Sequence, residues 1–261
     1  MSGFSDSLQQ NTEYRSVLQE IEGKFFPFGV LGALHIQKAF LLHGITEDTG
    51  RRAMVLLPDE ASADKMAEDL RSFGTTAAVF PAKDVSFVSD QIRSKDYEQR
   101  RMGALCSWLL GQTKVLLLPA EAALQKTVPP GTLQNRIFRL SAGDTVSLPN
   151  LLSSLVSAGY TRAEEVEGKG QFAVRGGIVD FFPPERELPL RMELWGDTID
   201  TIAEFEVDSQ RRTDLVDSVL LTPSAELLAE NRDVTAEELL RLSTKIRSKQ
   251  AEQIKTKLQR D

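Results

Sequence analysis

The segment Gly32-Ala-Leu-His-Ile-Gln-Lys-Ala39 has the spacing of a phosphate-binding loop without its chemistry. A working loop reads G-x-x-x-x-G-K-[ST], where the second glycine lets the backbone wrap the phosphates and the hydroxyl holds Mg²⁺. Here Gly32 and Lys38 keep their places, whereas Gln37 replaces the second glycine and Ala39 lacks the hydroxyl. We therefore expect a degenerate, non-functional loop that holds neither a nucleotide cofactor nor a metal ion.

The other residues that could do chemistry do not combine into a site. His35 and His43 stand on one expected helix with no further ligand at a suitable spacing, so we expect no metal site. No Ser-His-Asp arrangement is suggested, and the apolar run around Cys106 is typical of a buried helix residue. We expect no catalytic residue in this chain.

Two strand-like runs, residues 171–184 and 189–197, flank a proline-rich connection. The second run alternates in character, and because strand side chains have a period of two, its two faces differ. One face holds Leu190, Met192 and Leu194, and the other holds Arg191, Glu193 and Trp195. The second set is expected to lie on a polar, solvent-facing side of a sheet.

We interpret Arg175, Arg191 and Trp195 as a protein-binding site. Arg175 precedes the Gly176-Gly177 turn, so its side chain can project from the end of a strand. Exposed Trp and Arg on a rigid sheet are typical of binding hot spots. The alternative, a lone half-buried Trp that only packs, stays open on the pattern alone. All three side chains are expected to contribute little to folding, because the opposite face supplies the core.

The first half of the chain reads as a parallel α/β lobe. Residues 53–58 and 114–119 are short, continuous apolar runs, and the stretch Asp59–Phe73 has helical periodicity. Continuous apolar strands joined by helices indicate a parallel sheet that is covered on both faces. A further strand is expected around residues 29–31, directly before the degenerate loop.

The second half reads as an inserted α+β domain followed by a return segment. A strand around Ile137–Leu140 and a helix over Leu148–Ala158, ended by Gly159, precede the two runs described above. Thr235-Ala-Glu-Glu238 is a capping box for a last helix. The α/β chain is therefore expected to have three parts: a degenerate NTPase-like lobe (1–132), the inserted domain (133–218), and a return segment with a C-terminal helix (219–261).

Composition narrows the classes of function. The 261 residues carry a net charge of −7, which argues against a free-standing nucleic-acid binder because phosphate contacts need a basic surface. The single cysteine excludes an internal disulfide, as in proteins of a reducing compartment. No apolar run approaches the roughly 20 residues that span a bilayer, and the N-terminus lacks the basic start of a signal peptide. We expect a cytoplasmic protein with no membrane contact.

The run FAVRGGIVDFFPP, residues 172–184, and the run that follows it, residues 188–211, carry a family resemblance. Together they resemble the second domain of the transcription-repair coupling factors (Mfd) and of UvrB, and the looser resemblance covers nearly the whole chain. In both families this domain docks the excinuclease subunit UvrA. The resemblance therefore implies a UvrA-binding domain with Arg175, Arg191 and Trp195 at the contact positions, the last of which holds an aromatic residue in the coupling factors.

The degenerate loop separates the two families. UvrB keeps an intact phosphate loop and a tyrosine-rich hairpin that probes damaged DNA, and both features are missing from this sequence. The coupling factors are therefore the closer match. They imply a non-catalytic adaptor that recruits UvrA to stalled RNA polymerase in nucleotide excision repair.

The resemblance places other activities in further domains. In the coupling factors an ATP-driven DNA translocase and the contacts to RNA polymerase and double-stranded DNA lie further along the chain. Since this sequence stops at Asp261 without a helicase motif, a fragment or a truncated gene is implied. Two alternatives stay open: a UvrB-like ATP-binding repair enzyme domain with a divergent loop, and a structural scaffold that restrains the motor.

Overall fold

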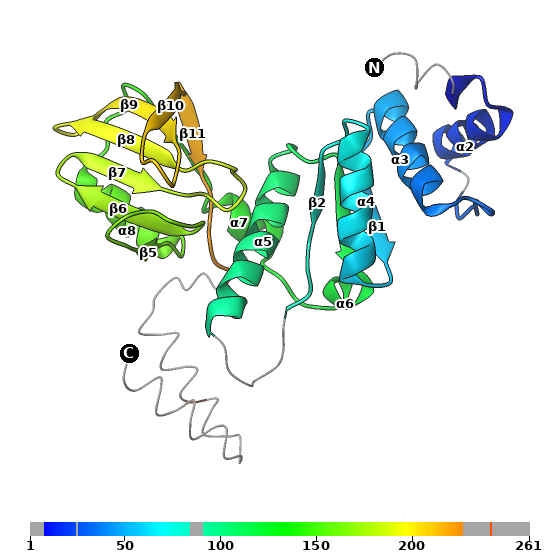
Figure 1. The fold of residues 1–261 in the computed structure, drawn as a ribbon, viewed down its shortest axis with the longest axis horizontal. Helices are drawn as coiled ribbons and strands as arrows, with labels where there is room; N and C mark the ends of the chain where they lie inside the picture. Colours follow the sequence, from blue (N-terminus) through cyan, green and yellow to red (C-terminus); the bar gives the residue numbers. More distant parts are fainter. Residues whose placement is uncertain (1–7, 25, 84–90, 227–240, 242–261) are drawn as a thin grey trace.

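Residues 8–24, 26–83, 91–226 and 241 are described by the computed structural model (Figure 1), the side chains of 91–96 excepted. Two lobes lie on either side of the helix α5 (Gln91–Leu109). The first lobe holds a three-stranded parallel sheet, and the second holds a six-stranded sheet and a two-stranded sheet. This mixed α/β arrangement agrees with the predicted fold class. The predicted capping box at 235–238 and the helix after it lie outside the described residues.

The first lobe is a parallel sheet with helices on its two faces. Its strands, in the order β1-β3-β2, are β1 (Ala53–Leu57), β3 (Val115–Pro119) and β2 (Ala77–Val79). Its other helices are α2 (Thr12–Gly23), α3 (His35–Thr49), α4 (Glu60–Ser72), α6 (Ala120–Ala123) and α7 (Pro130–Gln134). Residues of α3 and α4 pack against one face of β3, and residues of α5 and α6 pack against the other.

The cover predicted for both faces of the sheet is present on β3 and incomplete on β1. Every residue of β3 is buried, as in the interior of a parallel sheet. In β1, however, the side chains of Met54 and Leu56 are exposed. The expected symmetric cover is therefore wrong for β1, because α5 and α6 pack against β3 on that face and leave those two side chains bare.

The helix predicted over Asp59–Phe73 is confirmed as α4. Asp59 caps its N-terminus, since its side chain accepts a hydrogen bond from the backbone N–H of Ser62 at 2.7 Å. The apolar residues recur at helical spacing, which turns one stripe toward the sheet. The buried members of this stripe are Ala63, Met66, Ala67 and Leu70.

The strand expected around residues 29–31 is absent, and this prediction is wrong. The backbone over 26–34 is irregular, with Val30 and Leu31 exposed. A strand needs a hydrogen-bonding neighbour, and in the part of the chain that the structure describes no strand pairs with the outer edge of β1. Pro27 also lacks an N–H to donate, and Gly29 has no side chain to pack.

The second lobe packs one face of a six-stranded sheet against the helix α8 (Leu148–Ser157). In spatial order the strands are β10 (Arg212–Leu215), β9 (Thr198–Phe205), β8 (Leu190–Trp195), β7 (Ile178–Phe181), β6 (Gln171–Arg175) and β5 (Thr161–Arg162). Alternate strand residues, among them Val179 and Met192, join α8 residues in the core. The predicted helix is confirmed, and it ends before Gly159, whose φ of 90° suits glycine. We call the sheet surface opposite α8 the outer face.

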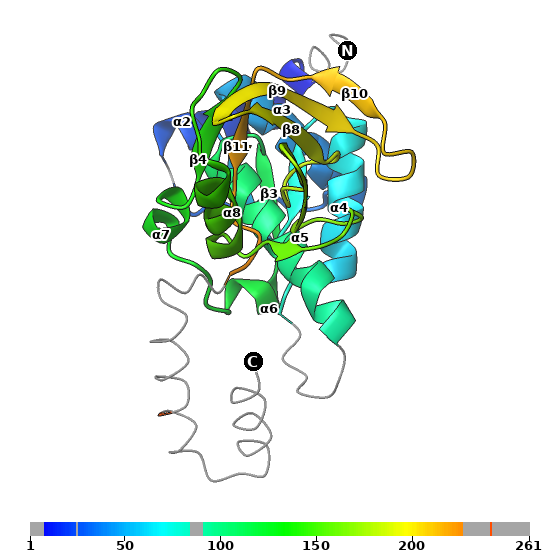
Figure 2. The same ribbon diagram turned by 90° about the vertical axis from the view of Figure 1, so that its left-hand side faces the viewer.

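The chain enters and leaves the second lobe through two adjacent strands. β4 (Phe138–Ser141) pairs antiparallel with β11 (Ser218–Leu221), and both contribute to the core beside α8 (Figure 2). This pairing is what an inserted domain requires, because its two ends must return to the same place. The pairing extends to Leu221, beyond the boundary predicted at residue 218. The division into three parts stays a prediction.

The helix α5 joins the lobes by close contacts. A Cβ added to Gly103 would lie 2.6 Å from the carbonyl oxygen of Pro184, so only glycine lets the helix backbone approach that turn. Arg101, two residues earlier in α5, is buried, and its Nε donates to Glu226 Oε1 at 2.9 Å. This ion pair fixes the segment that returns from the second lobe against the first.

Replacing Gly103 should therefore loosen the junction. We expect Gly103→Ala to lower the free energy of unfolding by about 1–3 kcal/mol, the usual cost of overpacking, although alanine favours helix. Gly131→Ala is the matched control, since no atom lies within 4 Å of its added Cβ. Urea unfolding of both variants checks this, and equal stability would contradict the close contact.

Candidate protein-binding site

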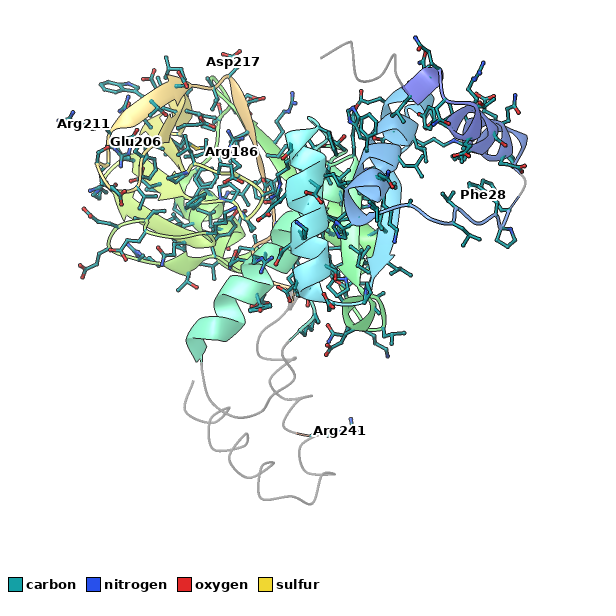
Figure 3. The ribbon with its side chains drawn as sticks, turned by 45° about the vertical axis from the view of Figure 1, so that its right-hand side comes forward. Phe28, Arg186, Glu206, Arg211, Asp217 and Arg241 are labelled. Carbon is teal, nitrogen blue, oxygen red and sulfur yellow. The ribbon has the colours of Figure 1, made fainter. Side chains whose placement is uncertain are left out.

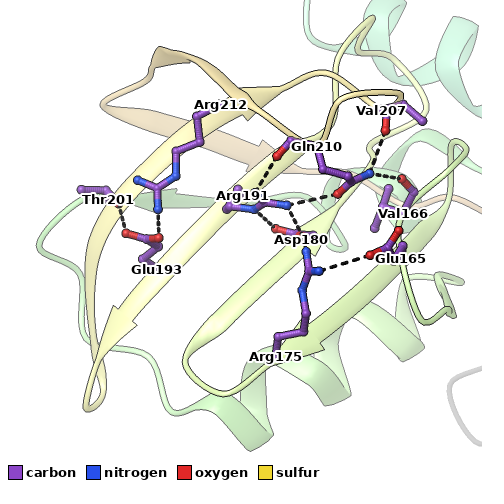
Figure 4. Close-up of polar contacts among 10 residues, drawn as sticks. All are labelled: Glu165, Val166, Arg175, Asp180, Arg191, Glu193, Thr201, Val207, Gln210 and Arg212. Atoms are coloured by element: carbon purple, nitrogen blue, oxygen red, sulfur yellow. Dashed lines mark hydrogen bonds and ion pairs between the residues drawn. The ribbon is translucent and has the colours of Figure 1, made fainter.

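The predicted binding residues lie on two strands of the six-stranded sheet, and Figure 4 shows the two arginines with their polar contacts. Arg175 ends β6, and Arg191 and Trp195 lie on β8. Between them β7 carries Asp180, which is paired in register with Ala173 of β6 and with Arg191 of β8. Paired residues of an antiparallel sheet share a face, so this register brings both arginines to one carboxylate.

Asp180 is the centre of a buried ion cluster, with only 1% of its side chain exposed. Its Oδ1 accepts from Arg191 Nε at 2.7 Å, and its Oδ2 accepts from Arg191 Nη2 at 2.8 Å. Arg175 Nη2 donates to the same Oδ2 at 3.0 Å. A carboxylate taken out of water needs such compensation, because an unpaired buried charge is strongly destabilising.

Arg191 is committed to contacts within the chain. Beyond Asp180, its Nη1 and Nη2 donate to the backbone oxygen and to Oε1 of Gln210, at 3.0 and 3.2 Å. Its guanidinium carbon lies 4.5 Å from the centre of the Phe205 ring. Hydrogen bonding to Asp180 raises the pKa of Arg191 above its ordinary value and outweighs the opposite effect of burial. Its side chain is 12% exposed.

The expected polar, solvent-facing side is therefore wrong at Arg191. A small second core covers this end of the outer face. Sequence periodicity did not reveal it, because one of its members, Val166, lies in an acidic loop. Its buried members are Val166, Ala173, Phe182 and Phe205. For the same reason we now expect Arg191 to contribute to folding.

Trp195 and Arg175, in contrast, are presented to solvent. Trp195 is 85% exposed at the end of β8, where Gly196 begins the turn to β9. The half-buried alternative is thus wrong for this residue. The Arg175 side chain is 46% exposed, and besides Asp180 it contacts Glu165 at 3.4 Å, a long surface ion pair of little energetic weight.

The degenerate loop lies on the other lobe, where it leads into α3. Gln37 fills part of the place that a phosphate would take, because its Oε1 accepts from the backbone N–H of Leu34, the N-cap of α3, at 2.8 Å. Gly32 has a φ of 81°, Lys38 is exposed, and Ala39 is packed in the core without a hydroxyl.

The loop and the outer face belong to opposite ends of the molecule. Phe28, which precedes the loop, lies at the far end of the first lobe, whereas Glu206 and Arg211 mark the distant end of the second (Figure 3). A ligand at one end would not touch residues at the other. The two regions must therefore be assigned functions separately.

The remaining candidates are placed as structural residues. His35 Nδ1 lies 3.1 Å from Asp69 Oδ2, and His43 Nδ1 lies 2.7 Å from Thr75 Oγ1. Burial raises the pKa of the Cys106 thiol. Within the described ranges, no three His, Cys, Asp or Glu side chains are grouped to hold a metal ion. None of the helices there is both long and apolar enough to cross a bilayer.

Comparison with known protein families identifies the lobe that carries the outer face. The family model of the UvrB interaction domain matches residues 138–227. The chain carries a UvrB interaction domain. The matched range begins with β4 and includes β11, so it contains Asp180, both arginines and the tryptophan.

Similar proteins that match most of this chain are consistent with the match to the UvrB interaction domain. The transcription-repair-coupling factor of Haemophilus influenzae is 27% identical over 197 residues, 75% of this chain and 17% of its own length. That of Bacillus subtilis is 23% identical over 258 residues, 98% of this chain and 21% of its own. The UvrABC system protein B of Thermosipho africanus is 23% identical over 248 residues, 89% and 37% of the two chains. The predicted resemblance is confirmed.

Substitutions in the ion cluster and at the exposed tryptophan should have different effects on the free energy of unfolding. We expect Arg191→Ala to lower the free energy of unfolding by about 3 kcal/mol, because it leaves Asp180 buried without its main partner. Trp195→Ala should change it by no more than about 0.5 kcal/mol, as at other surface sites. Urea unfolding measures both, with exposed Arg211→Ala as the control for loss of an arginine. Equal stability of the two arginine variants would show that the cluster does not support the fold.

Proposed function

We propose that this chain is a non-catalytic adaptor that binds UvrA in nucleotide excision repair. The observation that carries the proposal is the outer face of its UvrB interaction domain, where β8 ends in an 85% exposed tryptophan and β6 ends in a half-exposed arginine. Its similarity to transcription-repair-coupling factors supports the same reading. Nothing in the proposal requires a cofactor.

The chemistry of this face suits a protein partner. Trp195 offers a large apolar surface that loses contact with water on binding. Arg175 keeps N–H groups that can bond a partner carboxylate in a charge-assisted, bidentate manner. Glu165, which forms a weak surface ion pair with Arg175, would be displaced at little cost in free energy. A tryptophan and an arginine at the centre of an interface are the residues that most often dominate binding energy.

We extend the same proposal to the coupling of repair with transcription, which involves parts of the longer relatives beyond the matched region. The matched part is only about a fifth of the Bacillus subtilis coupling factor. We assign ATP-driven DNA translocation, and the contacts to RNA polymerase and double-stranded DNA, to the additional length of such relatives. In that arrangement the present chain supplies the UvrA contact and brings UvrA to a stalled polymerase.

Binding of purified UvrA tests the adaptor directly. We expect Trp195→Ala to lower the affinity by about 2 kcal/mol, roughly thirtyfold, which is the usual hot-spot threshold. Leu124→Ala removes another strongly exposed apolar side chain, on the first lobe, and should leave the affinity unchanged. An equilibrium titration, with circular dichroism to verify folding, measures both. If the parent chain does not bind UvrA, the adaptor function is wrong.

A second candidate, an ATP-binding repair enzyme domain, is favoured by the similarity to UvrABC system protein B along 89% of this chain. The loop argues against it, because Gln37 bonds the helix N-terminus and Ala39 cannot ligate Mg²⁺. We expect no saturable binding of millimolar ATP with Mg²⁺ in calorimetry. Binding that Lys38→Ala abolishes would replace the adaptor with an enzyme.

A further inference from the structure

The residues of the outer face divide into two kinds by their contacts. Arg191 spends four hydrogen bonds on Asp180 and Gln210, out of five N–H groups on a guanidinium. It therefore has little left to offer a partner. Arg175 and Trp195, which are far more exposed, present the free surface.

The position of Arg175 follows from the strand register. Ala173 stands directly opposite Asp180 and is followed on the same face by Arg175. Residue 173 carries only a methyl group there, and the longer Arg175 side chain reaches diagonally to Asp180, across a span that long side chains bridge. Asp180 thus holds the Nη2 group of the Arg175 guanidinium, while the side chain as a whole stays 46% exposed.

We propose that Asp180 is a positioning residue for UvrA binding, which acts by holding Arg175 in its binding orientation. Arg191 serves as the counter-charge that holds the Asp180 carboxylate fixed within the sheet, through two hydrogen bonds. The proposal rests on the proposed UvrA-binding function and adds a residue and a division of labour to it. Holding a long side chain before binding removes part of the entropy that binding would otherwise cost.

A double-mutant cycle between Asp180 and Arg175 tests this role. We expect Asp180→Asn to weaken UvrA binding by about tenfold, the effect of one charge-assisted hydrogen bond. Arg175→Ala should weaken it at least as much, and the double variant should be no weaker than Arg175→Ala alone. The same cycle with Trp195→Ala should give losses that multiply, because Trp195 has no bond to the cluster.

Two further variants separate positioning from folding. Asp180→Asn leaves Arg191 without its counter-charge, whereas Asp180→Asn combined with Arg191→Gln removes both buried charges and should fold. This combined variant should show the same loss of affinity through Arg175. Asp214→Asn, at an exposed carboxylate of β10, removes the same charge elsewhere on the sheet and should bind UvrA normally.

The order of the Arg175 side chain gives a readout without UvrA. Nitrogen-15 relaxation of the arginine Nε groups in the free chain should show Arg175 becoming more mobile in both Asp180 variants. Unchanged mobility would overturn the positioning role whether or not UvrA binds. Unchanged affinity of a folded Asp180 variant, or losses that multiply in the Arg175 cycle, would overturn it too. Failure of the parent chain to bind UvrA would instead remove the proposed function.

Discussion

The pairing of β4 with β11 is the constraint on which the arrangement of the two lobes depends. It brings the segments that enter and leave the second lobe together, one strand spacing apart. The second lobe also meets α5 at the junction: Pro184, between β7 and β8, contacts Gly103, and Glu226, after β11, is held by Arg101. The second lobe, with its outer face, is thereby fixed to the first lobe by several contacts rather than by a single connection.

Two of the described regions that could attract anions, the N-terminus of α3 and the outer face, are partly satisfied from within the chain. At the N-terminus of α3 a side-chain amide oxygen accepts the bond that a phosphate would make. On the outer face the situation is reversed, because a buried carboxylate satisfies most of one arginine and part of another. The second region differs because Arg175 remains half exposed and can still donate hydrogen bonds to a partner. The same face also carries the exposed Trp195.

Much of the fold and half of the candidate site follow from sequence periodicity. The stripe of α4, the apolar runs of β1 and β3, and the exposure of Trp195 depend on local spacing, which a single segment determines. Asp180 was not predicted, because its role depends on the register of three strands, and alternation alone does not fix which residues stand opposite. Residues 29–31 were misassigned as a strand, because an apolar run does not show whether a neighbouring strand exists to pair with it.

The contact between Gly103 and Pro184 has a mechanical consequence. A hinge between lobes needs slack, and here a helix backbone rests against a turn with no side chain between them. A pull on the second lobe, such as one from a bound partner, would be transmitted to α5 as through a stiff lever. The two lobes are therefore joined stiffly, because a movement of the second lobe presses on α5 without first straightening a flexible joint.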